Sequence, residues 1–131
     1  MDSLKALEVR VDKDKHALIV NFPNNFFSAG QHHLSAEQVR SMTDFLQVLS
    51  PYQSTLNIYF EGHADQQPVQ KSRTALLTDN FVLSSLRASS ALLLAKKLGY
   101  SEKNMFISAA SSNLRNTRSL TVRIEPKEEE L

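Results

Sequence analysis

Residues 56–65 read LNIYFEGHAD, and they hold the clearest structural signal in the sequence. Apolar and polar side chains alternate from Leu56 to Phe60, which predicts a strand with one buried face. The strand reaches a glycine at position 62, and a histidine and an aspartate follow two residues apart. Residues two apart in an extended chain point to the same side. His63 and Asp65 therefore mark the end of this strand as the first candidate for a functional site.

The segments on either side of this strand predict a sheet with helices. Alternation predicts a hairpin of strands over residues 7–11 and 17–22, and Ser35 to Gln38 has the form of a capping box for a helix ending before Pro51. A second helix is expected from a cap at Thr78 or Asp79 to about Leu98, with Gly99 as its stop. Two further strands are expected over 105–107 and 120–124. Strands that alternate with helices predict a two-layer α/β or α+β fold. The second helix is expected to bury a leucine stripe: Leu83, Leu86, Leu93, Leu94 and Leu98.

Composition narrows the class of protein. The 131 residues fit one domain, here assigned to residues 1–126, with 127–131 as a solvated acidic tail. A net charge of +1 gives no indication of nucleic-acid binding, and the absence of cysteine excludes a disulfide framework or thiolate site. No apolar run approaches the roughly 20 residues of a membrane span, and Met1-Asp2-Ser3 does not begin a signal peptide. We expect a cytosolic protein or a soluble part of a longer one.

A metal site and an enzyme are the first alternatives to consider for His63 and Asp65. A metal would need a further ligand, for which His32 or His33 is the available candidate, and only one of these neighbours could point to the same side. The alternative is that His63 packs beside the turn and forms local hydrogen bonds. No G-x-S-x-G elbow or glycine-rich phosphate loop is present. We therefore expect no metal, no cofactor and no enzymatic activity.

Arg87 says more about a possible ligand than His63 does. It lies along the edge of the predicted apolar stripe, one turn after Leu83. An arginine in this position either extends to solvent or forms a structural ion pair, or it faces a ligand. Its planar guanidinium group can bind a carboxylate through two parallel hydrogen bonds, and Asp65 at the end of a neighbouring strand could bind an ammonium group. Together the two would recognise a zwitterion.

Two separated motifs indicate a known family. The sequence Gly62-His63-Ala64-Asp65, followed by Asn80-x-x-Leu83-Ser84-x-x-Arg87-Ala88, resembles the OmpA-like peptidoglycan-binding domain, which reads G-H-T-D and then N-x-x-L-S-x-x-R-A. The resemblance covers about residues 7–125. Within the family, the residues 66–69 (QQPV) and the long interval from Asp65 to Arg87 look most like MotB-type flagellar stator proteins.

The resemblance implies a fold and a function. The fold is an α+β OmpA-like two-layer sandwich, with a βαβαββ core and an N-terminal hairpin strand. The function is non-catalytic binding of peptidoglycan in the periplasm, with the diaminopimelate of the stem peptide as ligand. The residues that the resemblance assigns to that ligand are Asp65, Arg87, Asn80, Leu83, Ser84, His63 and Arg118. A stator protein of this type is a homodimer in this domain, is held in the inner membrane by an upstream helix, and works with a channel-forming partner subunit.

The sequence departs from the family pattern at two places. Ala64 stands where the family has threonine, and the segment before Arg118 is shorter than the family's loop and keeps one arginine of its usual pair. Two alternatives follow. One is an OmpA- or Pal-like envelope anchor, and the other is an OmpA-like domain that serves dimerisation or protein interaction without binding the wall.

Overall fold

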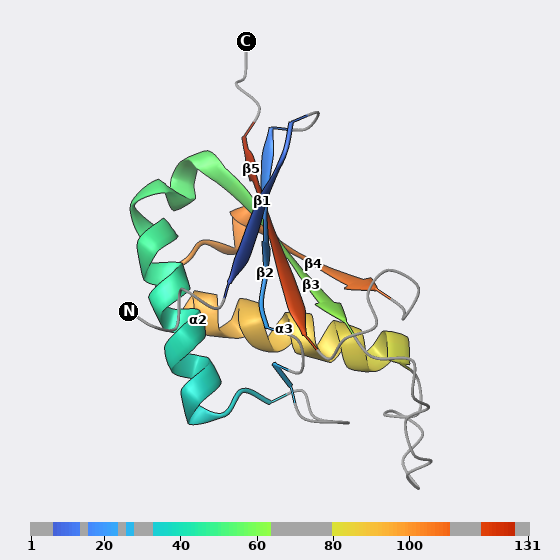
Figure 1. The fold of residues 1–131 in the computed structure, drawn as a ribbon. Coiled ribbons are helices and arrows are strands. Elements are labelled where there is room, and N and C mark those ends of the chain that lie inside the picture. The colour runs from blue at the N-terminus through green and yellow to red at the C-terminus, as the bar shows by residue number, and fades with distance from the viewer. Residues whose placement is uncertain are drawn as a thin grey trace, which may run out of the picture.

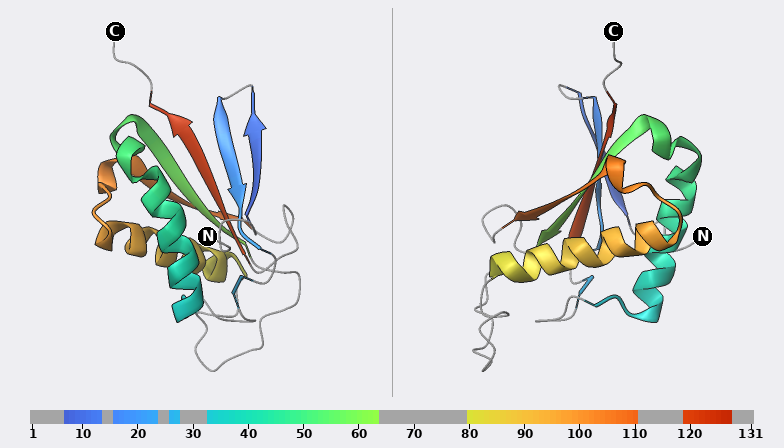
Figure 2. Two further views of the ribbon diagram at one scale, coloured as in Figure 1. Left: turned by 60° about the vertical axis from the view of Figure 1, so that its left-hand side comes forward. Right: turned by 180° about the vertical axis from the view of Figure 1, so that it is seen from behind.

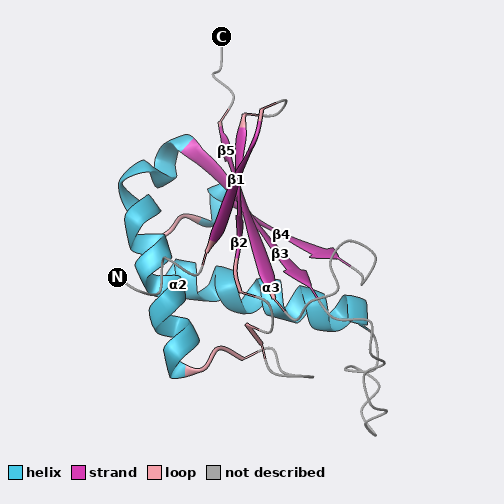
Figure 3. Ribbon diagram, viewed as in Figure 1, coloured by secondary structure: helices cyan, strands magenta, loops and turns pink. Residues whose placement is uncertain are grey.

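The computed structural model describes residues 7–13, 16–23, 26–27, 33–63, 80–110 and 119–127. These residues form one five-stranded sheet with two α-helices (Figures 1 and 3). In chain order the elements are β1 (Glu8–Asp12), β2 (Ala17–Asn21), α2 (Ala36–Leu49), the 3-10 helix η1 (Ser50–Thr55), β3 (Leu56–His63), α3 (Asn80–Lys97), the 3-10 helix η3 (Glu102–Asn104), β4 (Met105–Ala110) and β5 (Leu120–Pro126). The predicted α+β class and order of elements are confirmed.

The strands lie in the order β1-β2-β5-β3-β4. All neighbours are antiparallel except β3 and β4, which are parallel and are connected through α3. The last strand of the chain, β5, therefore lies at the centre of the sheet between β2 and β3. Figure 2 shows the same arrangement from two further directions.

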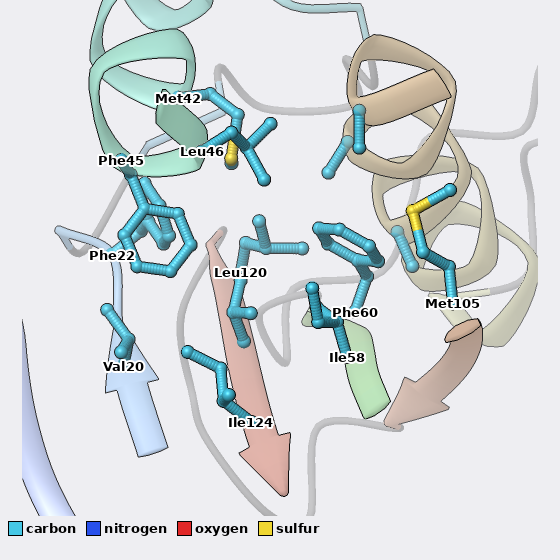
Figure 4. Packing of buried hydrophobic residues seen from close by; sticks show 14 of the residues in the cluster. Val20, Phe22, Met42, Phe45, Leu46, Ile58, Phe60, Met105, Leu120 and Ile124 are labelled. Atoms are coloured by element: carbon cyan, nitrogen blue, oxygen red, sulfur yellow. The ribbon is translucent and has the colours of Figure 1, made fainter. Parts of the chain in front are cut away.

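Both helices cover one face of the sheet. Met42, Phe45 and Leu46 of α2 are buried against strand residues such as Phe60 and Leu120, as Figure 4 shows. The predicted capping box begins α2, because the Ser35 amide donates to Gln38 Oε1 (2.7 Å) and the Gln38 amide donates to Ser35 Oγ (3.3 Å). None of the helices in the described segments has the length and apolar character needed to cross a bilayer.

Gly99 ends α3 as predicted. Its φ of 98° lies in the left-handed region that favours glycine. The Gly99 amide donates to the carbonyl of Lys96 and the Tyr100 amide donates to that of Ala95, which together form a Schellman motif. Burial raises the pKa of Tyr100 to about 12, so at neutral pH its hydroxyl is protonated and donates to the Leu46 carbonyl. The predicted caps at the start of this helix lie outside the described residues.

The predicted leucine stripe of α3 is wrong in part. Leu83 is buried, but Leu93 is 55% exposed and Leu98 is 36% exposed. The residues that face the sheet are instead small or polar, and all are fully buried: Ser84, Arg87, Ala88, Ala91 and Ala95. Their spacing is also helical, and the small size of Ser84, Ala88, Ala91 and Ala95 lets the helix axis approach the sheet closely. The leucine pattern therefore identified the buried face only in part: Leu83 is buried, and Leu86 and Leu94 are half-buried.

Candidate functional site

The predicted site lies where β3 ends and α3 begins to cross the sheet. Gly62 of β3 is paired with Leu120 on one side and with Ala109 on the other. The His63 amide donates to the Ser119 carbonyl at 2.9 Å, which holds the strand in the sheet up to its last residue. Ala64 and Asp65 lie outside the described residues.

Gly62 is needed because the α3 backbone lies directly on it. A Cβ atom at position 62 would lie 1.8 Å from the Ser84 carbonyl oxygen and 3.0 Å from the Ala88 nitrogen. These are backbone atoms of a packed helix and cannot rotate away as a side chain could. The glycine of the first motif and the serine and alanine of the second are therefore two sides of one helix–strand contact.

Arg87 follows Ser84 by about one helical turn and is fully buried. Its Nη1 donates to the main-chain oxygen of His63 at 2.8 Å. Its Cζ lies 5.1 Å from the centre of the Phe27 ring, a distance at which the positive charge is attracted by the ring face. The hydrogen bond to His63 and the contact with Phe27 therefore hold the guanidinium at the end of β3. It does not extend to solvent, which was one of the alternatives open from the sequence.

The His63 side chain is bonded within the sheet. His63 is 2% exposed, and its Nε2 lies 2.8 Å from Thr121 Oγ1. The Thr121 hydroxyl donates to Asn21 Oδ1 at 2.7 Å, so its oxygen accepts from the histidine, which places a proton on Nε2. A chain of three side chains, buried at His63 and Thr121 and half-buried at Asn21, thus joins β3, β5 and β2.

Replacing Thr121 by valine is expected to lower the free energy of unfolding by about 1–3 kcal/mol. Valine has a similar shape but cannot accept from His63 or donate to Asn21, so two polar groups lose this partner. Urea unfolding measures the change. Thr121→Ser keeps the hydroxyl and is the matched control, and a loss in Thr121→Ser with none in Thr121→Val would show that the methyl packing matters and the hydrogen bonds do not.

The structure brings four of the predicted site residues together. Leu83, Ser84 and Arg87 of α3 are buried and the main chain of His63 contacts Arg87, whereas the buried His63 ring lies on the opposite face of the sheet with Thr121. Asn80 begins α3, and the sequence-predicted Asp65 and Arg118 lie outside the described residues. Their roles in ligand binding remain predictions.

Three residues of this region were not among the sequence predictions. They are Phe27, Asn21 and Thr121, which lie far from His63 and Arg87 along the chain. Among the described residues, no group of three His, Cys, Asp or Glu side chains is placed to hold a metal ion. His33, one of the two histidines considered as a third ligand, is exposed, and His32 lies outside the described residues.

The arrangement suits anion recognition. A buried guanidinium, fixed in orientation, presents a planar set of donors that matches a carboxylate. Burial strengthens its electrostatic interactions because water is excluded. The strand end that it contacts leads after two residues to Asp65, a carboxylate of opposite charge.

Comparison with solved structures gives the fold a name. The periplasmic domain of Helicobacter pylori MotB is 15% identical with a TM-score of 0.77, and the match covers 92% of this chain and 87% of that chain. The cell wall anchor of the type VI secretion system of Pseudomonas aeruginosa is 16% identical with a TM-score of 0.75, covering 96% and 93%. The OmpA-like domain of FopA1 from Francisella tularensis is 16% identical with a TM-score of 0.65, covering 95% and 83%.

These matches establish the fold class. The chain has the OmpA-like fold that is also found in MotB periplasmic domains, as the sequence motifs predicted. No protein-family model matches the sequence, and no curated protein matches it significantly.

Proposed function

We propose that the chain is a non-catalytic peptidoglycan-binding domain that anchors a larger assembly to the cell wall. The observation that carries this proposal is Arg87, a buried and oriented guanidinium bonded to the last residue of β3. The fold supports it, because the chain is similar to a solved cell wall anchor and to an OmpA-like domain.

The ligand follows from the charges at the site. Arg87 would bind the carboxylate and Asp65 the ammonium group of the diaminopimelate side chain in the stem peptide. Asn80, Leu83, Ser84 and Arg118 would shape the pocket around it. We assign His63 a supporting role, because its carbonyl orients Arg87 and its ring is bonded to Thr121.

We further propose that the domain is of the MotB type. It would then act in the periplasm as part of an inner-membrane stator protein, as a homodimer, with a channel-forming partner subunit. The support is the similarity of fold to MotB periplasmic domains and the long interval between Asp65 and Arg87. In a longer gene product, a membrane helix that carries an aspartate would favour this assignment, whereas a lipidated cysteine would favour a Pal-like anchor.

Co-sedimentation with purified peptidoglycan sacculi tests the binding function. The wild-type chain is expected to sediment with sacculi, and Asp65→Asn and Arg87→Ala are expected to lose binding, because each removes a charged contact worth about 2–5 kcal/mol. Arg40→Ala removes an exposed arginine of α2 and is the control that should bind like wild type. Circular dichroism of each variant verifies that the fold is kept, and sacculus binding by both folded site variants would refute the assignment.

A further inference from the structure

One border of the sheet is a strand with an exposed apolar side. In the order of strands β1 is terminal, and the left view of Figure 2 shows it as the outer edge of the sheet. Val9 is 57% and Val11 is 61% exposed, and Leu18, which is paired with Val11, is 41% exposed. These three side chains lie on the side of the sheet that the helices cover elsewhere, because Leu18 is paired with the buried Ile124.

The other side of β1 carries alternating charge. Glu8, Arg10 and Asp12 point to the opposite face from the two valines. Glu8 and Arg10 are exposed, while Asp12 contacts Arg123 of β5 at 3.4 Å. The edge strand thus presents apolar residues on one face and an acid–base pair on the other.

We propose that β1 pairs antiparallel with β1 of a second copy of the chain, with the two-fold axis at Val9. In this register Val9 faces the partner's Val9, and Val11 faces the partner's Leu7. Glu8 faces the partner's Arg10, and Arg10 faces the partner's Glu8. Each of these pairs is apolar with apolar or acid with base.

Neighbouring registers lack this complementarity. An axis at Arg10 places Arg10 opposite Arg10 and Glu8 opposite Asp12, and an axis at Glu8 places two glutamates together. An axis at Val11 places Val9 opposite Lys13. A shift that pairs odd with even positions would put charged side chains on the apolar face.

This self-complementarity indicates that the partner of β1 is a second copy of the chain. A two-fold dimer uses the same surface on both chains, and only an antiparallel pairing of the two edges satisfies that symmetry. The pairing extends the sheet across the axis and covers the backbone groups of an edge strand, which otherwise favour uncontrolled association. The inference rests on the homodimer proposed above and assigns its interface, but it does not depend on peptidoglycan binding, since β1 lies at the opposite border of the sheet from the β3–β4 pair.

Charge reversal at the interface tests the proposal. The wild-type chain is expected to sediment at equilibrium with twice its mass of 14.8 kDa. E8R places an arginine opposite the partner's Arg10, and R10E places a glutamate opposite the partner's Glu8, so each variant alone should weaken dimerisation at least tenfold. An equimolar mixture of E8R and R10E chains, and the double variant E8R/R10E, should restore the dimer.

Cross-linking provides an independent measurement of the register. The natural chain has no cysteine, so V9C introduces a single thiol at the proposed axis. Mild oxidation should convert V9C to covalent dimers, whereas I107C, which is 50% exposed on the other border strand, should stay monomeric. A monomeric wild-type chain, unchanged dimerisation of both charge variants, or cross-linking at position 107 in place of position 9 would each overturn the proposal.

Discussion

Replacing Gly62 by alanine is expected to destabilise the fold by about 3 kcal/mol or more, because α3 has no room for a single added methyl group. The new Cβ would lie 1.8 Å from the Ser84 carbonyl oxygen. Overpacking of a core costs about 1–3 kcal/mol when side chains can rearrange. Here the obstructing atoms belong to the helix backbone, so α3 would have to move as a unit away from the sheet, and Arg87 would move with it away from the His63 carbonyl.

Gly99→Ala is the matched control for this prediction. Nothing lies within 4 Å of a Cβ at position 99, so its cost comes only from the φ of 98° and should be about 1–2 kcal/mol. Urea unfolding of both variants separates the two effects. Equal losses for the two glycine variants would show that the close contact between Gly62 and Ser84 is relieved by a small shift of the helix.

The fold was largely predictable because its signals are local. The alternation in β3, the capping box of Ser35 and the stop at Gly99 each depend on residues close together in sequence. The buried face of α3 was not fully predictable, because the sequence pattern emphasised leucines and gave no reason to prefer alanines. The reason lies in Gly62, on a different element, which lets the α3 backbone at Ser84 and Ala88 lie directly on the strand.

The site was predictable as a motif and not as a set of contacts. The sequence predicted that Arg87 and the end of β3 act together, and the structure joins them through the His63 carbonyl. It could not predict that Phe27 packs on the guanidinium or that Thr121 binds His63, since these contacts depend on how distant segments meet. Main-chain acceptors and aromatic faces leave no distinctive residue pattern.

Replacing Arg87 by methionine is expected to separate binding from stability. Methionine fills much of the same space without charge, and removing a buried charge outright offsets part of the cost of the lost bond to His63. The free energy of unfolding should change by no more than about 1–2 kcal/mol. Affinity for sacculi should fall on the order of 30-fold or more, because a buried charged contact is worth at least about 2 kcal/mol and each 1.4 kcal/mol is tenfold.

Arg87→Lys distinguishes charge from geometry in the same assay. Lysine keeps the positive charge but lacks the planar guanidinium, so it cannot bind a carboxylate through two parallel hydrogen bonds. We expect affinity between those of wild type and Arg87→Met, measured by titrating a fixed protein concentration with sacculi and by urea unfolding in parallel. Wild-type affinity in Arg87→Met would show that the buried guanidinium is a structural group alone. The proposed ligand would then have to bind elsewhere.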